Sequence, residues 1–195
     1  MDDRLLVPAM SVISPAAKRI TKRPQRSRRG ASRTRQSAVR WSAKRFVIIA
    51  SRFNEPVSRG LVDGATGVLR RAGIPGRNVQ LVWVPGAFEL PVVAARVARR
   101  TPTPHAIIAL GALIRGQTPQ YEVLAHAVAQ GLSQVSVSTG IPVTFGVVVA
   151  STAAQANARA GGTLGNRGAE AALAALDVLK LFNDLKPSRG RIRSP

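Results

Sequence analysis

The chain has 195 residues, of which 45% are hydrophobic, and its 29 Lys and Arg against 9 Asp and Glu give a formal net charge of +20. This length suits one domain with tails, and no apolar run approaches the about 20 residues that a membrane-spanning helix needs. Because cysteine is absent, disulfides, thiolate chemistry and cysteine-ligated metals are excluded, and we expect a soluble, cytoplasmic protein.

The first 44 residues form a basic segment without helical or strand periodicity. Residues 1–45 hold 13 Lys or Arg against two Asp, a net charge of +11, whereas residues 46–185 carry +5 and residues 186–195 carry +4. Too little apolar surface is present to offset the entropy of ordering, so we predict a disordered basic arm over 1–44 and a basic tail over 186–195. The arm suits organelle targeting, binding of nucleic acid or another anion with Trp41 stacking on bases, or a passive solubilising role.

After Arg45, short apolar runs alternate with helical patterns. Runs rich in β-branched residues predict strands covered on both faces at 46–51, 79–84, 106–112 and 143–149. Helical patterns are predicted over 56–72, 88–100, 119–139, 152–160 and 167–182, with Pro56 and Pro119 in first turns and Gly73 and Gly140 at helix exits. This alternation predicts an α/β fold, a three-layer αβα sandwich around a four-stranded, mainly parallel sheet.

Ligands of open α/β sheets collect beyond the carboxyl ends of the strands. Those ends here carry SRFNE (51–55), VPGAFELP (84–91), GALIRGQTPQYEV (111–123) and QANARAGGTLGNRG (155–168). Glycine lets backbone amides approach a ligand, and Phe53 offers a flat face to a heteroaromatic ring. The glycine-flanked turn before Pro119 predicts a phosphate seat at a helix N-terminus, with Arg159 or Arg115 adding a forked contact.

Each of these residues also has a structural interpretation. Phe53 and Phe88 suit core positions, and Thr118 suits a helix cap. Glu89 is either a partner of the helix dipole or an acceptor that faces a ligand. Local pattern alone leaves these alternatives open.

Taken together, SRFNE, VPGAFELP, GALIRGQTPQYEV, FGVVVASTAAQANARAG and GNRGAEAA resemble lumazine synthases, in family order and close to family spacing, from about residue 46 to 181. The resemblance implies a flavodoxin-like sandwich over 45–185 and a transferase of riboflavin biosynthesis. That enzyme condenses 5-amino-6-(D-ribitylamino)uracil with 3,4-dihydroxy-2-butanone 4-phosphate to 6,7-dimethyl-8-ribityllumazine, phosphate and water. No metal or organic cofactor is implied.

The resemblance also implies a role for individual residues. Phe53 stacks on the pyrimidine, the backbone of Ala112, Leu113 and Ile114 hydrogen-bonds the substrate, and Phe145 comes from a neighbouring subunit. The remaining implied contacts are Ala87, Phe88 and Glu89 with the pyrimidine and ribityl chain, and Gln117, Thr118 and Arg159 with the phosphate. Arg167 stands where the family commonly has the lysine of GNKG. This replacement keeps the positive charge but changes the geometry of the charged group.

Gln120 is the main departure, because it occupies the position of the family's proton-shuttling histidine. A neutral amide has no usable pKa near neutrality. The contribution of general acid–base catalysis, typically about 10² to 10⁴ in rate, is therefore reduced. His126 is a poor substitute, since six helical residues turn it by about 240° and displace it by about 9 Å. A slow synthase, a ligand-binding paralogue and a shell protein that kept the fold are all open, and the retained substrate-holding positions favour the synthase.

The resemblance implies assembly as well. Family members form pentamers with sites between adjacent subunits, and the short segment RAGGTLGNRG is typical of relatives that build icosahedral capsids, so a 60-mer is expected. In such a shell, many copies of the basic arm would hold nucleic acid or acidic cargo. The rival hypotheses are therefore a nucleic-acid-packaging protein on this scaffold and a flavodoxin-like flavin carrier.

Overall fold

The computed structural model of the chain describes residues 39–185. Residues 1–38 of the predicted basic arm and the predicted tail 186–195 lie outside the described residues. The short stretch 39–44, predicted as part of the arm, forms a 3-10 turn, η1 (Trp41–Ala43), and Trp41 packs against the core. Asn78 Nδ2 also donates to the Ser42 carbonyl at 2.8 Å. Trp41 is therefore partly buried against the domain, and its suggested stacking on bases stays a prediction.

Four parallel strands form the central sheet in the order β2-β1-β3-β4. They are β1 (Phe46–Ser51), β2 (Val79–Val84), β3 (Ala106–Ile114) and β4 (Val143–Ala150). The central strands β1 and β3 are buried almost throughout. The edge strands leave Leu81, Phe145 and Val149 between 41% and 44% exposed, so the prediction that all four strands are covered on both faces is wrong at the edges.

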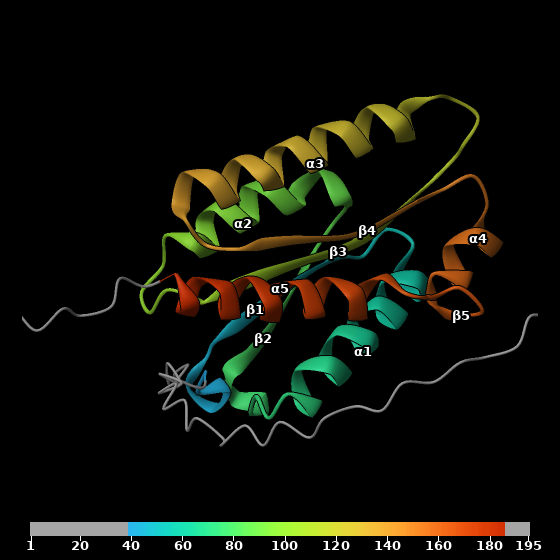
Figure 1. Cartoon of the computed structure of the whole chain (residues 1–195). Helices are drawn as coiled ribbons and strands as arrows, with labels where there is room; N and C mark the ends of the chain where they lie inside the picture. Colours follow the sequence, from blue (N-terminus) through green and yellow to red (C-terminus); the bar gives the residue numbers. More distant parts are fainter. Residues whose placement is uncertain (1–38, 186–195) are drawn as a thin grey trace, which may run out of the picture. The chain divides into compact units, whose positions relative to one another are not determined.

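Helices cover the sheet in two layers (Figure 1). One layer holds α1 (Glu55–Arg71) and α5 (Arg167–Asp184), and the other holds α2 (Leu90–Ala98) and α3 (Gln120–Thr139). Successive residues of β1 alternate between the two layers: Phe46 and Ile48 belong to one core cluster, Val47 and Ile49 to the other. This arrangement confirms the predicted α/β class and three-layer αβα sandwich.

The helix ends largely follow the sequence signals. Gly73 and Gly140 adopt positive φ angles of 80° and 68° just after α1 and α3, as predicted for helix exits. Pro56 lies in the first turn of α1, but Pro119 is the residue before α3. Two further 3-10 turns, η2 (Gly76–Asn78) and η3 (Ala87–Glu89), precede β2 and α2.

A small hairpin beside α4 (Ala153–Ala158) was not predicted. It consists of β5 (Ala160–Gly162) and β6 (Gly165–Asn166), which pair antiparallel. Strands of two and three residues among glycines carry no alternating pattern, so periodicity cannot reveal them.

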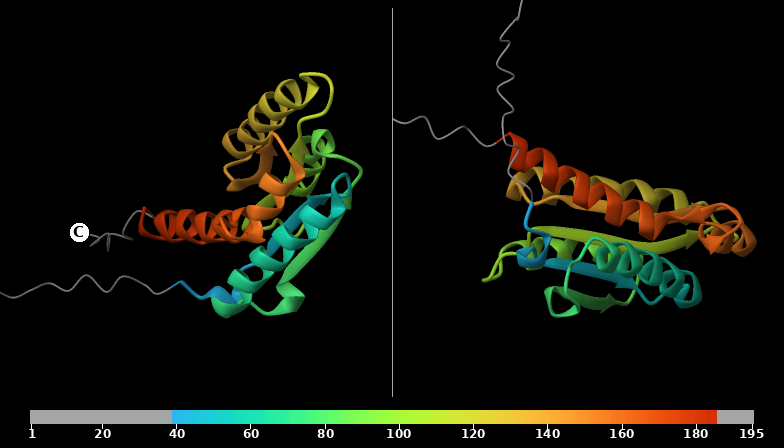
Figure 2. Two further views of the ribbon diagram at one scale, coloured as in Figure 1. Left: turned by 90° about the vertical axis from the view of Figure 1, so that its right-hand side faces the viewer. Right: turned by 60° about the horizontal axis from the view of Figure 1, so that its bottom comes forward.

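The parallel topology brings the carboxyl ends of the strands to the end of the domain where α4 and the turn before α3 lie. The stretch before β1 and the C-terminal end of α5, where the described chain begins and ends, lie at the opposite end (Figures 1 and 2). Within 39–185, no helix is long and apolar enough to cross a membrane.

Candidate active site

Phe53 is held at the end of β1 by a tightly bonded turn. The amides of Arg52 and Phe53 donate to the carbonyls of Val84 and Pro85 at 2.8 and 3.0 Å. Asn54 takes a left-handed conformation with φ of 61°, and its Nδ2 donates to the Ala112 carbonyl at 3.0 Å. This turn ties three strand ends together and leaves the Phe53 side chain 72% exposed.

The turn after β2 presents backbone and a second aromatic ring. Glu89 Oε2 accepts from the Gly86 amide at 2.8 Å, which closes the start of η3. Glu89 is thus engaged with the backbone, as in the dipole-partner alternative. Phe88 is 59% exposed instead of buried in the core.

The turn between β3 and α3 is open. Residues 115–120 are all exposed, and α3 begins at Gln120 without a side-chain cap. Thr118 therefore does not cap α3, and its hydroxyl lies on a surface that also exposes Gln117. The structural alternative for Thr118 is wrong.

These three turns surround a cavity of about 350 Å³. Most of the residues predicted to bind substrate come together here, with Gln120 among them. The lining consists of Phe53, Gly86, Ala87, Phe88, Ala112, Leu113, Ile114, Gly116, Thr118, Gln120, Tyr121 and Leu124. We call this cavity the ring pocket. Gln117 and Glu89 are not part of its lining; Glu89 instead borders the groove between α2 and α3.

Tyr121 is a lining residue that the sequence did not single out. Its hydroxyl donates to Glu122 Oε1 at 2.7 Å. This hydrogen bond, with smaller contributions from partial burial and from the negative charge of Glu122, raises the pKa of Tyr121 above its ordinary value, while the charge of Arg115 opposes the shift. Tyr121 therefore remains a neutral hydroxyl across the physiological pH range.

Three other predicted residues line a second cavity, of about 380 Å³, on the edge strand β4. Its lining is Phe145, Val147, Val148, Val149, Arg159 and Arg167, and we call it the arginine pocket. The Arg167 amide donates to the Arg159 carbonyl at 2.9 Å, which holds the two residues together. Arg167 also forms a 2.6 Å ion pair with Glu170, whereas no ion pair involving Arg159 is found within 39–185.

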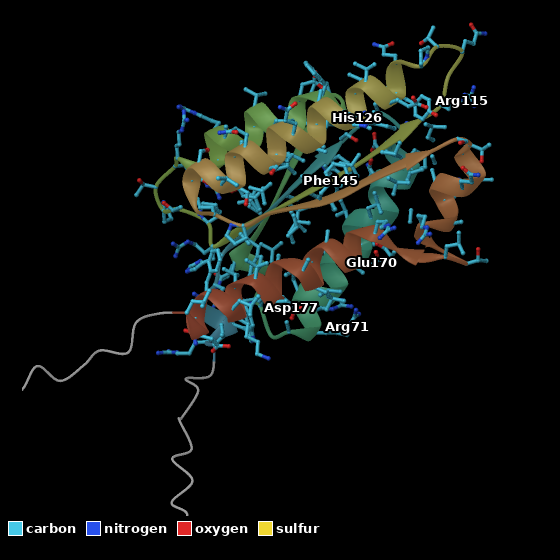
Figure 3. The ribbon with its side chains drawn as sticks, turned by 45° about the horizontal axis from the view of Figure 1, so that its top comes forward. Arg71, Arg115, His126, Phe145, Glu170 and Asp177 are labelled. Atoms are coloured by element: carbon cyan, nitrogen blue, oxygen red, sulfur yellow. The ribbon has the colours of Figure 1, made fainter. Side chains whose placement is uncertain are left out.

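The two pockets share no residue within one chain. Figure 3 shows Phe145 on β4 between α3 and α5, and Arg115 far from it at the end where α3 begins. His126 lies farther along α3, where Nδ1 is 2.8 Å from the Glu122 carbonyl oxygen, and it does not line the ring pocket. This placement is consistent with the interpretation of His126 as a poor substitute for the missing histidine.

The ring pocket suits a flat, partly polar molecule. Exposed aromatic faces can stack on a heteroaromatic ring, and the strand-end backbone supplies hydrogen-bonding groups. The arginine pocket supplies positive charge suited to a phosphate group. Within residues 39–185, no group of three or more His, Asp or Glu is placed to hold a metal ion.

Comparison with known proteins gives one consistent result. A family profile described as 6,7-dimethyl-8-ribityllumazine synthase matches residues 43–183. Among similar curated proteins, the 6,7-dimethyl-8-ribityllumazine synthase of Gemmatimonas aurantiaca is 46% identical over 76% of this chain and 90% of its own length. Those of Leuconostoc mesenteroides and Thermus thermophilus are 41% and 45% identical, over 73% and 71% of this chain and 91% and 87% of their own lengths.

Proposed function

The chain belongs to the 6,7-dimethyl-8-ribityllumazine synthase family, whose members are transferases of riboflavin biosynthesis, and from this premise we propose that it catalyses the lumazine-forming condensation itself. The substrates are 5-amino-6-(D-ribitylamino)uracil and 3,4-dihydroxy-2-butanone 4-phosphate. The observation that carries this proposal is the ring pocket, where Phe53, Phe88 and the end of β3 converge on one cavity.

Each substrate has a matching part of the surface. The pyrimidine ring stacks on Phe53, and its polar edge meets the backbone of Ala112, Leu113 and Ile114. The ribityl chain passes Ala87, Phe88 and Glu89. The phosphate is bound by Gln117, Thr118 and Arg159, with Arg167 adding charge beside it.

The complete site forms between two subunits. Phe53 and Phe88 are left exposed in one pocket, and Phe145 is left exposed in the other. If the arginine pocket of one copy covers the ring pocket of the next, the rings are buried and the phosphate-binding cations meet the pyrimidine half. Such a head-to-tail contact closes into a ring of subunits, and we propose a pentamer. An icosahedral shell of pentamers is the further assembly that the short hairpin segment favours.

Gln120 lowers the rate without abolishing it. Holding two reactive small molecules in one site contributes strongly to rate, with effective molarities of about 10⁵ M and above in well-oriented systems. The amide of Gln120 can orient a carbonyl or a water but cannot exchange a proton near neutral pH.

The test is lumazine formation by the purified full-length chain, compared with Gln120→His. We expect slow turnover by the wild type and a gain of about 10-fold or more in kcat for Gln120→His. A full-length chain and a Gln120→His variant that both form no lumazine would show that the family activity has been lost.

A second candidate function is the binding of nucleic acid by an assembled shell, and the charge distribution favours it. Residues 1–45 carry a net +11 and residues 186–195 carry +4, and the described chain ends at Val39 and Leu185 at the same end of the domain (Figure 1). Counterion release then predicts salt-sensitive retention of nucleic acid. Removal of residues 1–38 should abolish this retention, and an unchanged ratio of nucleic-acid to protein absorbance would argue against the candidate.

A further inference from the structure

The ring pocket contains one ionisable side chain, Tyr121. All other lining residues in the described part of the chain are Gly, Ala, Leu, Ile, Phe, Thr or Gln. Among these side chains, Tyr121 alone can exchange a proton with an ordinary biological acid or base. It also follows Gln120 directly in sequence, at the start of α3.

The hydroxyl of Tyr121 is held by a carboxylate. Tyr121 Oη lies 2.7 Å from Glu122 Oε1, a normal distance for a hydrogen bond from a hydroxyl to an ionised carboxylate. Glu122 is exposed and does not line the pocket. The carboxylate therefore reaches a bound molecule only through the Tyr121 oxygen.

We propose that Tyr121 and Glu122 form the proton relay of the ring pocket. They take over the proton transfer that the neutral amide of Gln120 cannot perform. Tyr121 is assigned as the catalytic residue, because its side chain lines the ring pocket, and Glu122 is a positioning residue that also accepts the proton. This inference rests on the proposed condensation and specifies how its protons move.

The relay balances during carbon–nitrogen bond formation. The amino nitrogen of the pyrimidine attacks the ketone carbon, and the electron pair of the C=O π bond moves to the carbonyl oxygen. The nitrogen loses a proton to Tyr121 Oη while the Oη proton moves to Glu122 Oε1. The same path in reverse gives a proton to the former carbonyl oxygen and completes the carbinolamine. A second pass through the dyad carries the remaining N–H proton to that oxygen while the nitrogen electron pair forms the C=N bond and the C–O bond breaks. One water molecule leaves, and the dyad ends unchanged.

The charged surroundings of the Tyr121 hydroxyl come from three elements. Glu122 on α3 places negative charge at hydrogen-bond distance, and Arg115, in the turn after β3, contributes the opposing positive charge. Glu89 on η3, which packs against α3, turns its carboxylate to the Gly86 amide. Of these groups, Glu122 is the one bonded to the hydroxyl.

The kinetic test uses full-length Tyr121→Phe, which keeps the ring, and Glu122→Gln, which keeps an acceptor but removes the base. We expect kcat to fall by about 10² in Tyr121→Phe and by about 10 or more in Glu122→Gln, with KM for both substrates within about threefold. Asp63→Asn, which removes an exposed carboxylate on α1, should leave kcat unchanged. In Gln120→His/Tyr121→Phe, the imidazole should restore most of the lost rate.

The spectroscopic test is independent of catalysis. The chain contains a single tyrosine, so the near-ultraviolet absorption of tyrosinate reports Tyr121 alone. Glu122 favours the neutral hydroxyl, so Glu122→Gln should titrate at lower pH than the wild type, and Arg115→Gln should titrate at higher pH.

The outcomes separate the two proposals. A wild type that forms lumazine while Tyr121→Phe keeps its kcat within twofold overturns the relay and leaves the proposed function standing. Identical tyrosinate titrations of the wild type and Glu122→Gln also overturn it, because the hydrogen bond would then be absent in solution. If the wild type and Gln120→His both form no lumazine, the relay and the proposed function fall together.

Discussion

Asn54 is the residue that positions Phe53. A left-handed conformation costs a residue with a Cβ roughly 1 kcal/mol or more, and asparagine tolerates it better than most. Here Asn54 has φ of 61° and donates from Nδ2 to the Ala112 carbonyl, which fixes the end of β1 to that of β3. Phe53 can therefore stay exposed and still keep its direction.

Two substitutions at Asn54 separate its backbone role from its side-chain role. Asn54→Gly keeps the left-handed backbone accessible and loses only the hydrogen bond to Ala112, whereas Asn54→Ala loses both. We expect Asn54→Ala to lower the free energy of unfolding by about 1 kcal/mol more than Asn54→Gly. Chemical denaturation measures this difference, and equal stabilities would show that the backbone conformation carries no cost.

The lining of the ring pocket was predictable where glycine and aromatic residues follow a strand, as at Phe53 and Phe88. Tyr121 was not, because adjacent helical residues diverge by about 100° and only one of Gln120 and Tyr121 is expected to face a given ligand. The cavity curves around the first turn of α3, so both line it. Gln117 shows the opposite case: it lies in the predicted turn but outside the lining.

At the scale of elements, Asn166 connects the β5–β6 hairpin to two helices. Its Oδ1 accepts from the Ala169 amide at 3.0 Å and caps α5, and its Nδ2 donates to the Gly60 carbonyl of α1 at 2.8 Å. Gly64, one turn along α1, leaves the space that this side chain fills, since a Cβ there would overlap Asn166. The sequence GNRG thus anchors the hairpin that Arg159 and Arg167 flank.

We predict that Gly64→Ala and Asn166→Ala are coupled. Asn166→Ala should lower the free energy of unfolding by about 1 to 3 kcal/mol through loss of the cap and of the bond to Gly60. Gly64→Ala should cost about 1 to 3 kcal/mol by overpacking, and less when Asn166 is also alanine. Denaturant unfolding of the three variants measures the coupling.

Gly67→Ala is the matched control on the same helix. A Cβ at Gly67 would meet only the guanidinium end of Arg71, at 3.3 Å, and that side chain is exposed and flexible. Helix propensity then favours the variant by about 0.5 to 1 kcal/mol. If Gly64→Ala and Gly67→Ala lower the free energy of unfolding equally, the space beside Asn166 does not determine the cost of Gly64→Ala.

The sequence was sufficient for the bounds of two strands. Strands at 46–51 and 79–84 were predicted with the observed bounds, because mainly apolar runs that end at polar or glycine-containing turns mark them clearly. β3 runs two residues past its predicted end, because the apolar residues Leu113 and Ile114 continue the pairing with β4. The β5–β6 hairpin depends on contacts with α1, more than a hundred residues away in sequence, and no local pattern encodes it.

At the scale of the whole molecule, the ring pocket and the arginine pocket are separate surfaces with different chemistry. Phe53 and Phe88 line the ring pocket, whereas Phe145, Arg159 and Arg167 line the arginine pocket, and no residue belongs to both. The exposed rings of Phe53, Phe88 and Phe145 at these two pockets are typical of surfaces that another chain covers. If the site is shared between subunits, assemblies that mix two inactive variants can contain intact sites. A site within one chain does not allow this.

Mixed assemblies of two inactive variants should recover activity. Phe53→Ala damages the ring pocket and Arg159→Ala damages the arginine pocket, so each homogeneous assembly should lose turnover by about 10². In rings co-expressed in equal amounts, about a quarter of the contacts join an intact ring pocket to an intact arginine pocket, so lumazine formation should return to about a quarter of the wild-type rate. Co-expression of Phe53→Ala with Phe88→Ala gives no intact ring pocket and should recover nothing. If the first mixture is as inactive as the second, each site is contained within one chain, and the exposed rings must have another function.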